Sequence, residues 1–223
     1  MSLPWHRENP GLFSLEKSEV EAAFPNLHFV INDDIVLVRG TFPIVFDDQS
    51  LDHYLIEVEL RRDHPKGIPI VRETGGRIPR VSGRHMNPTD GTACVLLTDE
   101  RWWVWPPGSR LLSFLKGPVH NFFLGQSLVE LGEPWPFGQW GHGADGIREF
   151  YAERLGTDDI YGLMAYVEYL AKKKIKGHWP CPCQSGKRLR ECHGRTVHDL
   201  AEKIPRQVAM ESLKKLREQF KLL

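Results

Sequence analysis

The chain has 223 residues, of which 41% are hydrophobic and 10% aromatic, so it can build a folded core and is not a disordered chain. Its 29 basic and 29 acidic residues cancel, which argues against a general nucleic-acid-binding protein because such proteins carry a basic excess. No apolar run approaches the roughly 18 residues of a membrane-spanning helix, and the first ten residues are too polar for a signal peptide. With four cysteines, three of them clustered, these features predict a reduced, cytoplasmic protein.

The first part of the chain predicts a helix followed by an antiparallel meander. The helix is expected over residues 12–24, with Ser14 as its N-cap and Pro25 as its stop. Strand-like runs cover residues 27–31, 35–46, 54–60 and 68–71. The runs are separated by turn residues rather than by helices, which favours an antiparallel sheet. Residues 73–90, rich in Gly, Pro, Arg and Asn, predict a long irregular loop of the kind that often carries function.

The rest of the chain is expected to be mostly helical. A helix over residues 109–123 contains Pro118, which should kink it or divide it in two. Residues 133–143 look like a connector, although their tryptophans suggest that the segment packs down. Two helices at about 145–154 and 158–174 and a last one after Pro205 complete the predicted elements.

Three cysteines and a histidine near the C-terminus form a candidate metal site. Two cysteines stand one residue apart, and a Cys-His pair follows a loop that Ser185 and Gly186 can turn. Zinc favours four thiolate or imidazole ligands in a tetrahedron, so we expect a structural zinc ion rather than ordinary surface thiols. The expected ligands are Cys181, Cys183, Cys192 and His193.

The segment around these ligands resembles the SEC-C motif, which ends the SecA translocation ATPase and is appended to many other bacterial proteins. The shared features are Cys-Pro-Cys, Ser-Gly-Lys and Cys-His-Gly, and the departure is Gln184, where glycine is usual. The resemblance implies a binding appendage rather than a catalyst, and a bacterial source.

Cys94 stands alone, about 90 residues before the cluster, and its apolar neighbours would suit a buried small side chain. The surrounding sequence points elsewhere. His85-Met86-Asn87-Pro88 and Asp90-Gly91 precede it, and Trp102 follows eight residues later. This stretch resembles the active-site region of ubiquitin-conjugating enzymes, which have a His-Pro-Asn motif, a glycine, an apolar-Cys-Leu step and a tryptophan eight residues beyond the cysteine. Here the order is His-Met-Asn-Pro, and Asn87 is one residue closer to the cysteine.

The resemblance covers about residues 12–130 and implies an α+β fold: an N-terminal helix, a four-stranded antiparallel meander, an active-site loop and a helix. It also implies that Cys94 forms a thioester with the C-terminal glycine of a ubiquitin-like or other protein. Asn87 would polarise the thioester carbonyl or order the loop, and His85 would be a structural histidine or a base. The nearest candidates for the polar gate residue of that family are Gln126 and Ser127, whereas His120, His142 and Asp99 are expected to be structural or solvent-exposed.

These expectations divide the chain into a conjugating-like domain (1–130), a helical extension (131–176) and a zinc motif with a final helix (177–223). The partners implied are a ubiquitin-like protein, or a protein C-terminus such as that of a CBASS-type nucleotidyltransferase in an anti-phage operon. The sequence leaves open whether a separate activating enzyme is needed. No membrane and no specific nucleic acid is expected. The basic runs at 172–176 and 187–190 are either a solvated face or a patch for an acidic partner.

Two alternatives remain open from the sequence. The domain could be an inert conjugating fold that acts as an adaptor through the zinc motif and the basic helices. It could also be a cysteine hydrolase that uses Cys94 and His85, although no third residue that would hold the histidine against the thiol stands out.

Overall fold

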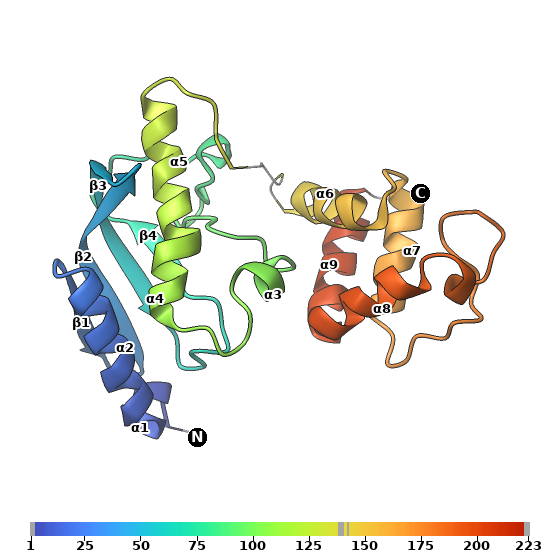
Figure 1. The fold of residues 1–223 in the computed structure, drawn as a ribbon, viewed down its shortest axis with the longest axis horizontal. Coiled ribbons are helices and arrows are strands. Elements are labelled where there is room, and N and C mark those ends of the chain that lie inside the picture. The colour runs from blue at the N-terminus through green and yellow to red at the C-terminus, as the bar shows by residue number, and fades with distance from the viewer. Residues whose placement is uncertain (1–2, 138–140, 142, 221–223) are drawn as a thin grey trace. The chain divides into compact units, whose positions relative to one another are not determined.

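The computed structural model describes residues 3–137, 141 and 143–220, and it divides the chain into two compact units. The first, here called the sheet unit, comprises Met1–Leu96 and Trp103–Gly138. The second, the helical unit, comprises Leu97–Trp102 and Gln139–Leu223. Both are drawn in Figure 1. The three-part division expected from the sequence stays a prediction.

Two helices open the sheet unit: α1 (Trp5–Glu8) and α2 (Pro10–Ala23). The N-cap of α2 is Asn9, whose side chain accepts a hydrogen bond from the backbone N–H of Leu12 at 3.1 Å. Asparagine is a good N-cap and Pro10 suits the first helical position, so the expectation that Ser14 caps the helix was wrong. The helix ends before Pro25, as expected.

The sheet is a four-stranded antiparallel meander in the order β1-β2-β3-β4, which confirms the predicted topology. Its strands are β1 (Leu27–Asn32), β2 (Ile35–Phe46), β3 (Gln49–Leu60) and β4 (Ile70–Glu73). The third strand begins at Gln49 rather than at residue 54. Asp47 and Asp48 both adopt positive φ angles and form a two-residue hairpin turn by themselves, which leaves the next residues free to pair.

A long helical rod covers one face of this sheet (Figure 1). It consists of α4 (Leu111–Phe114), the π-helical segment η2 (Leu115–Val119) and α5 (His120–Glu130). Pro118 lies in the π-helical segment, so the chain absorbs the missing N–H by a local widening and continues, instead of splitting into two separate helices.

The core of the sheet unit lies between this rod and the sheet. Leu111, Leu115 and Phe122 are buried, as expected, whereas Leu112 is only half-buried. The ring of Phe123 packs against Tyr54 of β3, with ring centroids 4.8 Å apart. Burial of each such side chain contributes roughly 1.5–3 kcal/mol, so this layer fixes the position of α5 on the sheet.

The helical unit contains four α-helices among its described residues: α6 (Ala144–Leu155), α7 (Ile160–Leu170), α8 (Gly194–Lys203) and α9 (Arg206–Gln219). The helix predicted at 158–174 is shorter at both ends: Asp159 caps its start, accepting from the N–H groups of Tyr161 and Gly162, and the helix ends at Leu170. Short helical turns lie at η1 (Ser82–Arg84) in the sheet unit and at η3 (Leu189–Glu191) in the helical unit. A third, α3 (Arg101–Val104), has residues assigned to both units. Among the described residues, no helix combines the length and the apolar character needed to cross a membrane.

The segment Leu97–Trp102 also belongs to the helical unit, although it is flanked in sequence by parts of the sheet unit. Its Asp99 is 1% exposed and accepts hydrogen bonds from the hydroxyl of Tyr151 (2.7 Å) and of Ser212 (2.7 Å). Asp99 is therefore a structural residue, as the sequence suggested. His120, which bonds the backbone of Val45, is structural too, and His142 lies outside the described residues.

Candidate functional site

Cys94 lies in a short hairpin whose two limbs pair antiparallel. Met86 is bridged to Ala93, the N–H of Cys94 donates to the carbonyl of His85 at 2.8 Å, and the N–H of Asn87 donates to the carbonyl of Thr92 at 2.8 Å. Met86 is 2% exposed and faces the core. Because side chains alternate along paired strands, Asn87 and Cys94, which follow the bridged pair on the two limbs, are expected on the face opposite Met86. His85 ends η1 in a left-handed conformation with a φ of 50°, so strand alternation does not fix the direction of its side chain.

The thiol of Cys94 is exposed, so it is not the buried packing residue that its apolar sequence neighbours suggest. Burial by the atoms packed against one side of it raises the pKa of the Cys94 thiol, and the carboxylate of Asp90 raises it further. At neutral pH the sulfur is therefore mostly protonated. It remains reachable by a partner.

The tip of the hairpin is shaped by side chains bonded to the local backbone. The Asn87 side-chain oxygen accepts from the N–H of Thr89 at 3.1 Å, and Asp90 accepts from both the N–H (3.0 Å) and the hydroxyl (2.7 Å) of Thr92. Gly91 has a φ of 67°, and a Cβ there would lie 2.7 Å from the side chain of Arg80. The amide oxygen of Asn87 thus orders the loop.

The hairpin is fixed to the rest of the sheet unit by β4. The N–H of Ala93 donates to the carbonyl of Val71 at 2.8 Å, and Thr92 is bridged to Arg72. At the end of β4, the buried carboxylate of Glu73 accepts from the N–H groups of Gly75 and Arg77. The long loop is irregular, as expected, but it is tied down at its start.

The loop is also tied to α5. The guanidinium of Arg84 donates to the side-chain oxygen of Gln126 at 2.7 Å, and the amide of Gln126 donates back to the carbonyl of Arg84 at 2.7 Å. Ser127 is bonded to Tyr54 and Asp52. Gln126 and Ser127 are 0% and 2% exposed, so neither offers an exposed polar gate. Gln126 instead supports the loop at Arg84.

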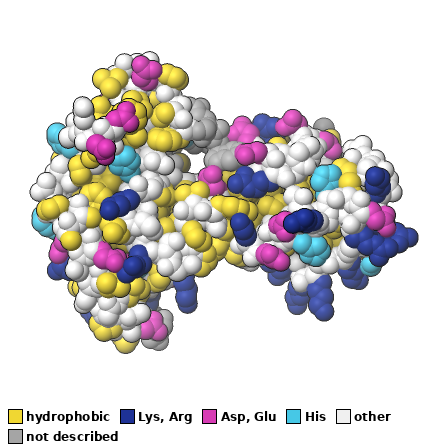
Figure 2. Space-filling model, viewed as in Figure 1, with side chains coloured by type: hydrophobic (Ala, Val, Ile, Leu, Met, Phe, Trp, Pro, Cys, Tyr) yellow, Lys and Arg dark blue, Asp and Glu magenta, His cyan; other side chains and the backbone are white. Residues whose placement is uncertain are grey.

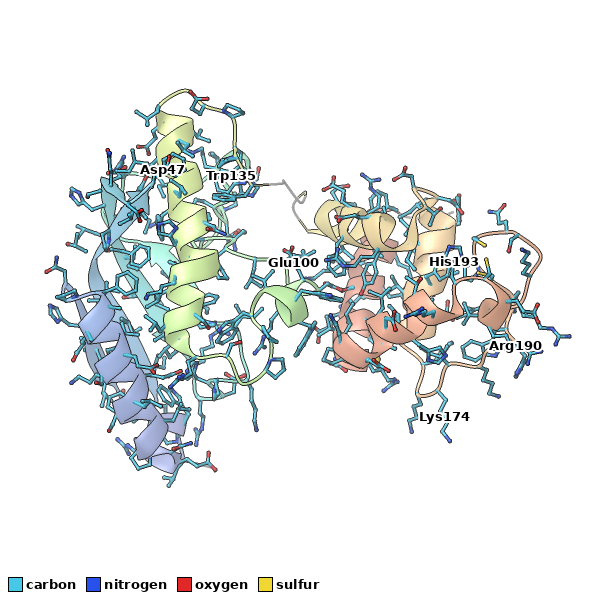
Figure 3. The ribbon with its side chains drawn as sticks, in the orientation of Figure 1. Asp47, Glu100, Trp135, Lys174, Arg190 and His193 are labelled. Carbon is cyan, nitrogen blue, oxygen red and sulfur yellow. The ribbon has the colours of Figure 1, made fainter. Side chains whose placement is uncertain are left out.

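The ring of His85 packs against Trp135, with ring centroids 4.5 Å apart. Trp135 also lies over Gly125 of α5, where a Cβ would come within 2.7 Å of the indole (Figure 3). The connector therefore packs down at Trp135, as its composition suggested. Trp135 contacts His85, whose carbonyl accepts the hydrogen bond from the N–H of Cys94. Sequence reasoning did not connect these residues, which stand 50 positions apart.

The second candidate site is the cluster of cysteines in the helical unit. A small hairpin presents it: Pro180 is bridged to Arg188, and the N–H of Cys181 donates to the carbonyl of Lys187 at 2.9 Å. Gln184 and Gly186 turn the intervening loop with positive φ angles of 62° and 72°. Cys192 follows η3, and His193 is the N-cap residue of α8 (Figure 3).

The four predicted ligand atoms converge, all lying within 4.8 Å of one another. The sulfur of Cys183 is 3.5 Å from the sulfur of Cys181 and 3.5 Å from the sulfur of Cys192. Nδ1 of His193 is 3.3 Å from the sulfur of Cys181 and 3.2 Å from the sulfur of Cys192. A tetrahedral ion with bonds of about 2.3 Å to sulfur would place its ligands about 3.8 Å apart. The cluster can therefore hold a metal ion with little movement.

Residues 180–195 match the SEC-C motif. The match contains all four cluster residues and covers only this part of the chain. No curated protein and no solved structure matches the chain.

Helix α7 supports the SEC-C motif from the side. The hydroxyl of Tyr166 lies 3.2 Å from the sulfur of Cys181, and its ring meets that of His193 edge-on at 5.4 Å. Within the motif, the hydroxyl of Ser185 lies 3.2 Å from the sulfur of Cys183. This contact, together with the backbone N–H of Ser185 and the neighbouring thiols of Cys181 and Cys192, lowers the pKa of the Cys183 thiol to about 5. A thiolate at Cys183 is the form that binds a metal ion.

Proposed function

We propose that the chain is a ubiquitin-conjugating-like acyl transferase in which Cys94 carries the acyl group. The observation that supports this most is the hairpin, in which the exposed Cys94 bonds through its N–H to the carbonyl of His85, one residue pair away from Asn87, beside the last strand of a meander. The order of elements also fits: α2 precedes the sheet and the α4–α5 rod follows the loop.

In the proposed reaction, the Cys94 thiolate attacks the activated carbonyl of a C-terminal glycine. A thioester forms, and the thiol or phosphate-bearing group of the activating partner leaves with the bonding electrons. An amine then attacks the thioester and expels the Cys94 thiolate. A raised thiol pKa suits a carrier, because the thiolate is then a stronger nucleophile and a poorer leaving group, so the thioester persists until an amine arrives.

We expect Asn87 to act on the thioester rather than on the sulfur. Diagonal neighbours on one face of a hairpin are separated by about 7–8 Å, which is too far for a direct contact but within reach of an acyl oxygen on Cys94. Its side-chain oxygen is already used by Thr89, so the NH₂ group is the end that can donate to the oxyanion. The packing of His85 under Trp135 favours a structural role for this histidine.

For the donor we keep the expectation drawn from the sequence resemblance: a ubiquitin-like protein, or another protein's C-terminus such as that of a CBASS-type nucleotidyltransferase. The test combines the protein with the products of neighbouring genes and looks for a higher-mass band that disappears on treatment with thiol. Cys94→Ala should abolish the band, whereas Cys94→Lys should give a thiol-resistant one. Asn87→Ala should slow transfer more than loading, by an amount on the order of 2.7–4 kcal/mol in the transfer barrier.

The absence of any Cys94 adduct with every neighbour would favour the adaptor function instead. That alternative rests on the SEC-C match, since the motif serves as a binding appendage in the proteins that it resembles. The band assay decides between them, because an adaptor forms no adduct on Cys94.

We also propose that the metal of the SEC-C cluster is zinc and that its role is structural. Three thiolates and an imidazole form a complete tetrahedral set that leaves no position for substrate, and this donor set is typical of structural Zn²⁺. Elemental analysis should find about one zinc per chain. Cys192→Ser should release it and lower the melting temperature of the helical unit, whereas Cys94→Ser should retain it. A zinc-free protein after gentle purification would contradict the proposal.

A further inference from the structure

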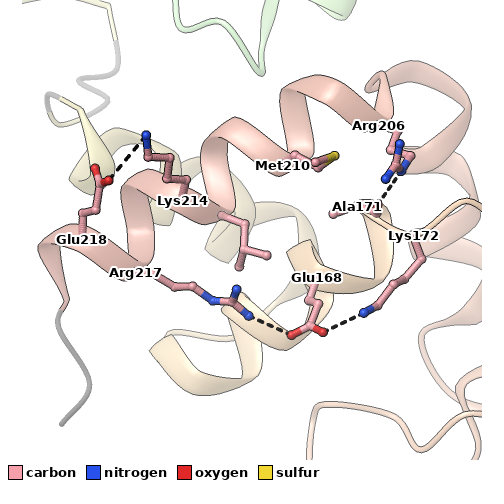
Figure 4. Close-up of a pocket in the computed structure, with 9 residues that line it drawn as sticks. Glu168, Ala171, Lys172, Arg206, Met210, Lys214, Arg217 and Glu218 are labelled. Atoms are coloured by element: carbon pink, nitrogen blue, oxygen red, sulfur yellow. Dashed lines mark hydrogen bonds and ion pairs between the residues drawn. The ribbon is translucent and has the colours of Figure 1, made fainter.

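A groove of about 670 Å³ runs between α7 and α9 in the helical unit (Figure 4). It is separate from the SEC-C ligands and from Cys94, and nothing in the proposed transfer reaction uses it. Its walls are charged, and its middle is apolar.

The groove lies in the most basic part of the chain. Residues 171–223 contain 14 Lys or Arg and five Asp or Glu. On the face drawn in Figure 2, Lys and Arg side chains gather over the helical unit. The groove itself is lined by four basic side chains and two acidic ones, so it carries an excess positive charge: Lys172, Arg206, Lys214 and Arg217 against Glu168 and Glu218.

The basic side chains are held by contacts that a partner can replace. The carboxylate of Glu168 accepts from Lys172 at 2.9 Å and from Arg217 at 3.0 Å, with 40% of the Glu168 side chain exposed (Figure 4). Exposed ion pairs of this kind contribute only about 0–1 kcal/mol. Arg206 is anchored differently, because its Nε donates to the carbonyl of Ala171 at the end of α7 at 2.7 Å.

The apolar lining of the groove consists of Ala171, the buried Leu213 and Met210, which is 39% exposed. A flexible thioether between charged walls adapts readily to an apolar side chain of a partner. A single-stranded nucleic acid would instead need aromatic rings on which bases can stack, and none of the described lining residues is aromatic.

We propose that the α7–α9 groove binds an acidic protein segment in which carboxylates flank an apolar side chain. The apolar side chain packs on Met210, and the carboxylates pair with Arg206, Lys172 and Arg217. Glu168 occupies the position of one partner carboxylate when the groove is empty, so it competes with the partner.

The probe is a fluorescent peptide of about 12 residues, mostly Glu with two Leu, whose binding to the full-length protein is followed by anisotropy. Lys172→Ala/Arg217→Ala should weaken binding roughly tenfold, and Met210→Asp should weaken it by a similar factor. Glu168→Gln should strengthen it severalfold, because it frees both cations without adding charge repulsion. Salt should weaken binding to the wild type.

The matched control is Lys187→Ala/Arg188→Ala, which removes the same charge from the SEC-C loop. An equal loss in this control would show attraction to net charge or to the motif, and would overturn the groove as the site. The proposal also fails if a labelled oligouridine binds more tightly than the peptide with the same variant pattern, or if Glu168→Gln leaves peptide affinity unchanged. Thermal unfolding of each variant shows whether a loss reflects misfolding, and the gain expected for Glu168→Gln is independent of that risk.

Discussion

The side chain of Cys94 is exposed, yet its thiol is held in the protonated form. Two causes act in the same direction: burial of one side of the sulfur and the nearby carboxylate of Asp90. Both disfavour the thiolate, so the fraction of reactive sulfur depends steeply on pH.

This environment predicts the pH dependence of alkylation. The rate at which iodoacetamide modifies Cys94 should still be rising above about pH 8.5, the ordinary pKa of a cysteine thiol. Asp90→Asn keeps an oxygen for Thr92 but removes the charge, so it should lower the pKa of Cys94 and speed the reaction at about pH 8. Mass spectrometry of the Cys94 peptide measures the rate. Asp48→Asn, in the β2–β3 turn, is the control and should not change it; a wild-type rate already level at about pH 8 would contradict the prediction.

Residues differ in how far the sequence could place them. The SEC-C ligands were predictable because they lie within 13 residues, a span over which the chain itself brings side chains together. Gln184 shows why glycine is usual at its position: its φ of 62° is one that glycine adopts without strain. The packing of His85 on Trp135 was not predictable, since it depends on how a distant connector folds back.

At the scale of elements, the hairpin of Cys94 is held from two sides. Strand β4 pairs with one limb through Val71, and Trp135 packs against the other limb at His85. Trp135 can take this position only because α5 has a glycine beneath it, at Gly125.

Gly125→Ala should therefore displace Trp135. Its new methyl group would lie 2.7 Å from the indole, and overpacking of this kind costs roughly 1–3 kcal/mol in the free energy of unfolding. With His85 no longer covered, Cys94 should also be alkylated faster. Gly117→Ala, in the same helical rod but with no atom within 4 Å of the added carbon, is the matched control and should leave both quantities nearly unchanged.

The strands were predictable because their apolar residues alternate, most clearly in β3, where Tyr54, Ile56 and Val58 are all buried. Helix α8 was missed. It starts directly after the ligand His193, and the sequence analysis predicted no helix between the cysteine cluster and Pro205, although Val197 and Leu200 are buried on this helix. The π-helical turn at Pro118 was also not foreseen, since a proline more often ends a helix than widens it.

On the scale of the whole molecule, the helical unit depends on a six-residue segment, Leu97–Trp102, that comes from elsewhere in the sequence. The key side chain is Asp99, which is buried and bonded to Tyr151 and Ser212. Burial raises the pKa of the Asp99 carboxyl, and the two hydroxyl groups offset only part of that effect.

A carboxyl with a raised pKa in the folded state binds protons more readily there than in the unfolded chain. It therefore favours folding at low pH, and this contribution is lost as the pH rises through the folded pKa. Relative to Asp99→Asn, the wild type should gain stability as the pH falls from about 7 to about 5. Chemical denaturation across this range measures the difference. Asp199→Asn, exposed on α8, should show no such trend, and a flat difference for Asp99→Asn would contradict the assignment.

The placement of Asp99 also limits how this protein can be recombined with others. A single splice point after the α4–α5 rod would transfer α6 to α9 but leave Asp99 behind, and the hydroxyls of Tyr151 and Ser212 would then lose their shared acceptor. A chimaera that carries the helical unit needs either a graft of Leu97–Trp102 or apolar replacements for both hydroxyl-bearing residues. Replacement of the helical unit therefore also requires a change at Leu97–Trp102, which stands in the sequence between the two parts of the sheet unit.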